Sequence, residues 1–226
     1  MNTHDECKSR LHTALHELRT RTEIEILAHD FEGAPLSYAS PEEVDGALQQ
    51  RFDTHLPSSV LACTAAHETF GCHWSLKHTS GTVNGEFNLH PPATSLPIEP
   101  PSLEWDLAES EEELSEQFLV IDEFPGGGTD SYTALRLVPG GTQALMWYHE
   151  AERGALPMNI DYCMYLRALA VTKGTLGWQF LFVDVSLEDS EFSPYVMGLK
   201  AMLAAFPGLF PDHDYAPLRE RLEARL

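Results

Sequence analysis

The stretch that decides the fold is residues 118–148, which read FLVIDEFPGGGTDSYTALRLVPGGTQALMWY. It contains three apolar segments rich in residues that favour strands, at Phe118–Phe124, Tyr132–Val138 and Thr142–Tyr148. They are separated by Gly126-Gly127-Gly128 and by Pro139-Gly140-Gly141, which are turn-forming sequences. Because such turns join neighbouring strands directly, the stretch predicts an antiparallel meander.

Upstream of the meander, Cys72–Leu76 and Thr82–Phe87 flank Thr79-Ser80-Gly81, a spacing that indicates a hairpin. Helices are expected before and after this hairpin. They are an amphipathic helix through Leu11, Leu15 and Leu18 that ends near Thr20–Thr22, one that starts at Ser40-Pro41-Glu42-Glu43, one from Pro57 to before Gly71, and a highly acidic one over Asp106–Gln117.

Helical patterns return after the meander. We expect a helix capped by Asn159 and ended by Gly174, and then a core block at Gly177–Val183. Ser193-Pro194 begins another helix that Pro207-Gly208 should break, and a short helix follows Pro217. This order predicts an α+β fold with a mostly antiparallel sheet flanked by helices. We expect a single domain over 1–226, with its core at about 40–183, an N-terminal helical segment at 1–39 and a C-terminal helical extension at 184–226.

The chain is strongly acidic. Its 226 residues include 35 Asp+Glu but 14 Lys+Arg, so the formal net charge is −21. Such a surface repels phosphates and anionic lipids, so we expect no nucleic-acid or membrane partner. The sequence contains no apolar signal-peptide core and no apolar run long enough to span a bilayer, which predicts a cytoplasmic protein. There Cys7, Cys63, Cys72 and Cys163 are expected to be thiols.

The negative charge is concentrated in two stretches. No Lys or Arg occurs between Lys77 and Arg136, and a second acid-only stretch covers residues 184–191. These stretches are either a solvated face or a surface that binds a basic partner. Repulsion within a run of like charges favours a partner that compensates it, and steering would speed its capture. The predicted partner-binding residues are Glu109, Glu111, Glu112, Glu113, Glu116, Asp122, Glu123, Asp130, Asp184, Glu188, Asp189 and Glu191.

No pattern of residues specifies a reaction. The triple glycine is not followed by Lys-Ser or Lys-Thr, so a turn is favoured over a phosphate-binding loop. His67 and His73 are six residues apart and would fall on different helix faces, which excludes the zinc-protease motif. No G-x-S-x-G occurs, and Cys163 lies on an apolar helix face where a thiol is inert. We therefore predict a protein that is not an enzyme and has no cofactor. The less favoured alternative is a metal-binding enzyme built around Cys63, His67, Cys72, His73 and His78.

Over about residues 40–183 the chain resembles the SMI1/KNR4 (SUKH) superfamily. The motifs that carry the resemblance occur in the family's order, and the most specific is a helix followed by Gly, Gly-Trp-Gln and aromatic-Leu-Phe. They are Ser40-Pro41-Glu42-Glu43, Leu56-Pro57, Phe70-Gly71, Trp74, the strand with Asp122, the triple glycine, Trp147-Tyr148, and the run from Tyr162 through Lys173-Gly174 to Phe182.

The resemblance implies a domain without catalytic residues. Many bacterial members are immunity proteins that bind and neutralise a cognate polymorphic toxin, often a nuclease or a deaminase. A toxin directed at nucleic acid carries a basic cleft, which an acidic inhibitor would match. The sequence therefore predicts an immunity protein with a basic toxin domain as its partner. The alternative is a regulatory or scaffold protein of the same fold that binds a cellular protein.

Overall fold

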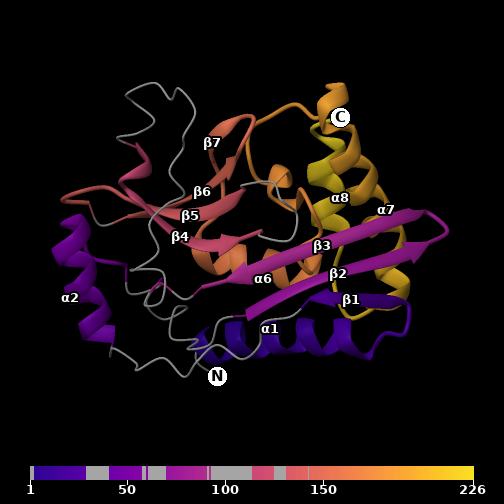
Figure 1. Cartoon of the computed structure of the whole chain (residues 1–226), viewed down its shortest axis with the longest axis horizontal. Coiled ribbons are helices and arrows are strands. Elements are labelled where there is room, and N and C mark those ends of the chain that lie inside the picture. Colours follow the sequence, from indigo (N-terminus) through magenta and orange to yellow (C-terminus); the bar gives the residue numbers. More distant parts are fainter. Residues whose placement is uncertain are drawn as a thin grey trace.

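The computed structural model describes residues 3–28, 41–57, 60, 70–90, 92, 114–124, 131–141 and 143–226. In these ranges, seven strands form one antiparallel sheet whose spatial order follows the chain (Figure 1). The strands are β1 (Ile24–Ala28), β2 (Phe70–His78), β3 (Gly81–Leu89), β4 (Phe118–Glu123), β5 (Tyr132–Leu137), β6 (Ala144–Glu150) and β7 (Gly154–Pro157). The hairpin (β2–β3) and the meander (β4–β6) are confirmed, whereas β1 and β7 had not been predicted.

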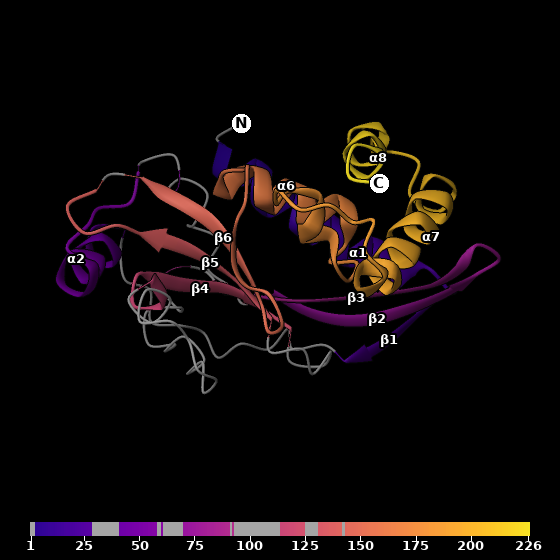
Figure 2. The ribbon, with the colours of Figure 1, turned by 90° about the horizontal axis from the view of Figure 1, so that it is seen from above.

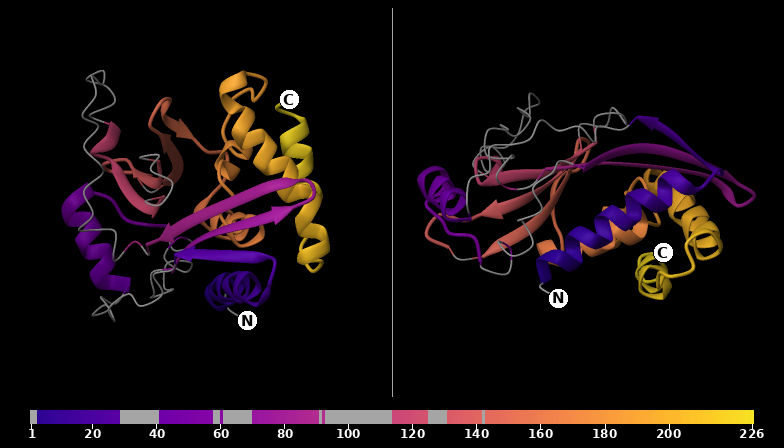
Figure 3. Two further views of the ribbon diagram at one scale, coloured as in Figure 1. Left: turned by 45° about the vertical axis from the view of Figure 1, so that its right-hand side comes forward. Right: turned by 90° about the horizontal axis from the view of Figure 1, so that it is seen from below.

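Helices flank the sheet, which confirms the predicted α+β class. The helices are α1 (Thr3–Thr20), α2 (Pro41–Phe52), α6 (Tyr162–Thr172), α7 (Ser193–Leu209) and α8 (Ala216–Glu223), with short 3₁₀ helices η1 (Trp178–Leu181) and η2 (Ser190–Phe192). Figure 2 shows α1, α6, α7 and α8 on one side of the sheet, with α2 at the far end from α7. The α1 helix packs along α6, and α7 packs on β3 (Figure 3).

The core lies between the sheet and these helices. It includes the predicted apolar block, in which Trp178, Phe180 and Leu181 of η1 are fully buried. Both terminal segments contribute to the same core, through Leu18 of α1 and Phe206 of α7. Residues of the segments predicted at 1–39 and 184–226 thus pack in the same hydrophobic cluster as residues of 40–183.

The ends of two helices differ from the predictions. Asp161, not Asn159, caps α6, because its carboxylate accepts the backbone N–H of Met164 at 2.7 Å. Pro207 does not break α7, which continues to Leu209. A proline leaves the carbonyl four residues earlier without its helical donor, and the Arg219 guanidinium donates to that carbonyl, Leu203 O, at 3.2 Å.

Two other predicted helices lie largely outside the described residues. Of the helix expected after Pro57, the structure describes Val60 as helical. Of the acidic helix, it describes the end, where Leu114 and Ser115 are helical and the next two residues form a turn.

One cysteine differs from the expected thiol state. Cys163, in the first turn of α6, is disulfide-bonded, and its partner lies outside the side chains that the structure describes. Cys72 is a free, buried thiol, and burial raises its pKa to about 11. None of the described helices has the length and apolar character needed to cross a bilayer.

Candidate functional site

The predicted acidic residues separate into three groups. Glu109, Glu111, Glu112, Glu113 and Asp130 lie outside the described residues. Glu116, Asp122 and Glu123 lie just before β4 or within it, and Asp184, Glu188, Asp189 and Glu191 lie between η1 and α7. Glu116 lines a pocket against α2, and α2 is at the opposite end of the molecule from α7 (Figures 1 and 2). The structure therefore separates Glu116 from the third group.

Asp122 is fully buried, which corrects its predicted place on a partner-binding surface. A register shift between Val120 and Asp122 interrupts the β4–β5 pairing. The Asp122 carboxylate accepts the hydroxyl of Tyr165 on α6 at 2.6 Å and the backbone N–H of Asn88 on β3 at 2.8 Å. Burial raises the pKa of Asp122 to about 7, although both hydrogen bonds act to lower it. Because β3 and β4 pair at Asn88↔Glu123 and Leu89↔Asp122, this carboxyl group connects the two parts of the sheet to α6.

Glu123 is half-buried beside this junction. Its Oε2 atom lies 3.0 Å from Nε2 of His90, so part of its charge is directed toward a neighbour in the same molecule. Glu116, by contrast, is exposed.

The third group forms a defined surface, residues 184–192, which we call the acidic loop. Two apolar side chains fix it to the core: Leu187 is 2% exposed and Phe192 is 6% exposed. The Phe192 ring packs edge-on against Phe180 of η1, with ring centroids 5.1 Å apart. Glu188, Asp189 and Glu191 lie between these anchors and are exposed. The carboxylates are therefore presented on a backbone that packing holds in place.

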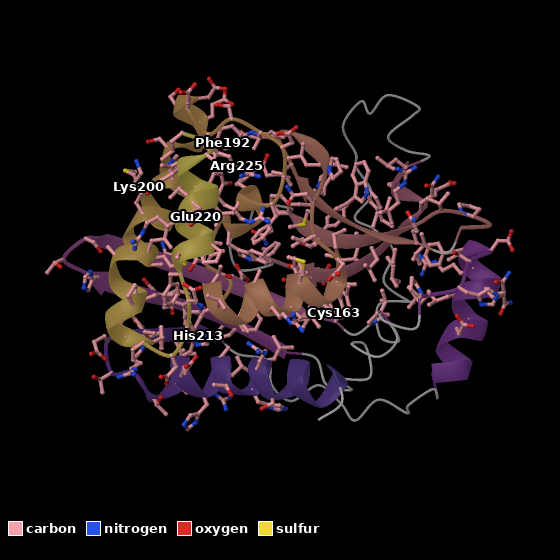
Figure 4. All side chains as sticks on the ribbon, turned by 180° about the vertical axis from the view of Figure 1, so that it is seen from behind. Cys163, Phe192, Lys200, His213, Glu220 and Arg225 are labelled. Carbon is pink, nitrogen blue, oxygen red and sulfur yellow. The ribbon has the colours of Figure 1, made fainter. Side chains whose placement is uncertain are left out.

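The C-terminal residues hold the start of the acidic loop. Arg225 donates from Nε to Val183 O at 3.0 Å, and Leu187 donates its backbone N–H to Arg225 O at 2.9 Å. Asp184 interacts electrostatically with the Arg225 guanidinium. Figure 4 labels Arg225 and Phe192 in the same part of the view.

Arg153, in the β6–β7 turn, holds the other end of the acidic loop. Its guanidinium donates to Glu150 Oε2 and to Glu191 Oε2, both at 3.0 Å. It also lies 4.2 Å from the centroid of the Phe192 ring. Glu191 is thus partly neutralised, whereas Glu188 and Asp189 form no salt bridge with any residue that the structure describes. Within the acidic loop, these two carboxylates are the ones that no described cation pairs with.

A second cluster of charges lies inside the molecule. Lys173 ends α6 in a left-handed conformation and is fully buried, with its Nζ 2.7 Å from Glu17 Oε2 of α1. His213 Nε2 lies 2.9 Å from the same carboxylate oxygen (Figure 4). Burial lowers the pKa of Lys173. Burial acts to raise the pKa of Glu17, but the hydrogen bonds and charge interactions with Lys173 and His213 together lower it. The cluster joins α1 to the end of α6 and so has a structural role.

Among the described residues, no three His, Cys, Asp or Glu side chains are placed to hold a metal ion. Of the alternative metal site, Cys63 and His67 lie outside the described ranges, and the Cys72 thiol is buried with a raised pKa, which makes it a poor nucleophile.

The sequence indicated the acidic loop but not the residues that position it. Arg153 and Arg225 lie far along the chain from the residues that they contact, and Leu187 and Phe192 are single apolar residues within the loop. Arg153 contacts Glu191 across 38 residues of sequence, so the residues around Arg153 do not indicate this contact.

Comparisons with protein-family models, with curated proteins and with solved structures find no match.

Proposed function

We propose that this protein is a non-enzymatic immunity protein that neutralises a cognate toxin by covering a basic surface of it with the acidic loop. The observation that carries the proposal is the placement of Glu188 and Asp189, which are exposed between two buried anchors. The resemblance to the SMI1/KNR4 superfamily supports the choice of a toxin as partner.

Two physical effects make the acidic loop suited to this role. A net charge of −21 attracts a cationic partner at long range and raises the association rate. Because Leu187, Phe192, Arg153 and Arg225 already fix the loop, binding has little further backbone entropy to remove. Affinity is then determined by contacts rather than by folding of the loop.

The proposal includes the predicted cytoplasmic location. Cytosolic glutathione and thioredoxin keep thiols reduced, so in that compartment the Cys163 disulfide would open.

Co-expression with the toxin encoded beside this gene tests the proposal. We expect the protein to restore growth and to form a complex with the toxin. In the Glu188→Lys, Asp189→Lys variant, we expect about tenfold slower association with a weaker dependence on salt. The matched control is Glu23→Lys, Glu25→Lys, which makes the same charge change at the start of β1, where both residues are exposed. The proposal is wrong if no complex forms, or if both variants slow association equally.

A further inference from the structure

A pocket of about 520 Å³ lies at the end of the molecule opposite the acidic loop. It is formed where the end of α2 meets the turn before β4 and the end of β5. Its volume falls within the range of about 300–1,000 Å³ that is usual for ligand sites. The residues that matter for its chemistry are Gln50, Phe52, Asp53, Glu116, Gln117 and Leu137.

Backbone contacts fix one wall of this pocket. Asp53 follows α2 in a left-handed conformation, with φ of 48°, and its carbonyl accepts the backbone N–H of Gly140 at 2.8 Å. Thr54 Oγ1 donates to Gly141 O at 2.7 Å. The end of α2 is therefore attached to the turn between β5 and β6, and the Asp53 carboxylate is held at the edge of the pocket.

Hydrogen bonds fix the opposite wall. The backbone N–H of Leu137 donates to Gln117 O at 2.9 Å, which holds the turn before β4 against β5. The side chain of Gln117 is oriented as well, because Arg136 Nε donates to its Oε1 at 2.9 Å. Both walls are thus set before any ligand arrives.

The lining combines apolar and negatively charged surface. Phe52 and Leu137 are 5% and 1% exposed and form an apolar base, Pro139 adds exposed apolar surface, and Asp53 and Glu116 are exposed acids. The lining also includes Arg51, whose guanidinium lies 4.9 Å from the centroid of the Phe52 ring. The lining itself carries two carboxylates and one guanidinium, and the Arg136 guanidinium lies next to it on Gln117 Oε1.

We propose that this pocket receives an arginine side chain presented by a protein partner. The apolar base suits the methylene stem, and a planar guanidinium pairs with carboxylates and amide oxygens at the rim. The arginine pocket and the proposed function have one assumption in common, which is that the partner is a basic protein. The pocket and the acidic loop are at opposite ends of the molecule, so each can fail without the other.

The test is an NMR titration with N-acetyl-arginine methylamide, followed through the side-chain amide signals of Gln50 and Gln117. The matched ligand is the citrulline analogue, which has nearly the same shape without the charge. We expect the arginine probe to shift both signals at millimolar concentrations and the citrulline probe to bind about tenfold more weakly or not at all.

Variants assign that binding to the pocket. We expect Asp53→Asn with Glu116→Gln to weaken binding of the arginine probe about tenfold. Asn tolerates the left-handed conformation at position 53, so this variant keeps the wall in place. The control variant, Glu23→Gln with Glu25→Gln, removes two exposed carboxylates at the start of β1 and should bind the probe as the parent does. The proposal is overturned if neither signal shifts, if citrulline binds equally well, or if both variants weaken binding to the same extent.

Discussion

Lys173 carries its charge at a position that is 0% exposed. Removing an ammonium group from water costs several kcal/mol, which here is offset by Glu17 at 2.7 Å and by the carbonyl of Ala170 at 2.9 Å. The two members of the pair are not equivalent. Glu17 has a second partner in His213 and a side chain that is 17% exposed, whereas Lys173 has no access to water.

We therefore predict that Glu17→Gln destabilises the protein more than Lys173→Met. Glu17→Gln leaves the buried Lys173 charge without its counter-charge, at a cost of about 3–5 kcal/mol. Lys173→Met leaves the Glu17 carboxylate, which can still hydrogen-bond to His213 and to water. Urea unfolding of both variants measures the difference. The double variant should be more stable than Glu17→Gln alone. Equal losses in the two single variants, or an additive double variant, would contradict this account.

At the scale of elements, α7 shows how a local helix breaker is accommodated by a distant side chain. Pro207 cannot donate to Leu203 O, and Arg219 of α8 donates to that atom instead. The helix then closes normally beyond the proline, since the N–H of Phe210 donates to Phe206 O at 2.7 Å. The contact also fixes α8 against α7.

This exchange of donors predicts that the contribution of Arg219 depends on Pro207. We expect Arg219→Ala to lower the free energy of unfolding by about 1–2 kcal/mol in the parent, because it leaves a helix carbonyl without a donor. In the Pro207→Ala background the new backbone N–H at position 207 supplies the bond, so the loss should be smaller by about 1 kcal/mol. Urea unfolding of the four proteins gives the coupling. If Arg219→Ala lowers the free energy of unfolding equally in both backgrounds, the hydrogen bond from Arg219 to Leu203 O does not contribute to stability.

Elements could be predicted from the sequence where their signals are local. The hairpin and the meander depend on turn residues within a few positions of each strand. The burial of Asp122 could not be predicted, because it depends on a register shift and on Tyr165, 43 residues away. The anchors of the acidic loop were missed for the same reason: Arg225 contacts Val183 across 42 residues. Local composition therefore located the acidic loop, but not the contacts that hold it.

At the scale of the whole molecule, the Cys163 disulfide limits the cellular compartments in which the protein is found in its oxidised form. A disulfide limits the conformations of the unfolded chain and contributes about 2–4 kcal/mol to stability. Cys163 lies at the start of α6, the helix that also carries Tyr165 and is followed by Lys173. The bond therefore supports the helix to which the sheet junction and the buried charge cluster are both attached.

The oxidised chain should contain two thiols among its four cysteines, because one disulfide uses two of them. We predict that alkylation in denaturant without a reductant adds two labels, counted by mass spectrometry, and that prior reduction raises the count to four. Cys163→Ser should give three labels under both conditions, because its former partner is then free. Cys72→Ser, which removes the buried free thiol, should give one label without reductant and three with it. Four labels on unreduced parent protein would contradict the disulfide. Counting labels in acid-quenched cells shows whether the disulfide is present where the protein is made. If the protein is in a reducing cytosol, the quenched cells should yield four labels and the protein purified in air should yield two.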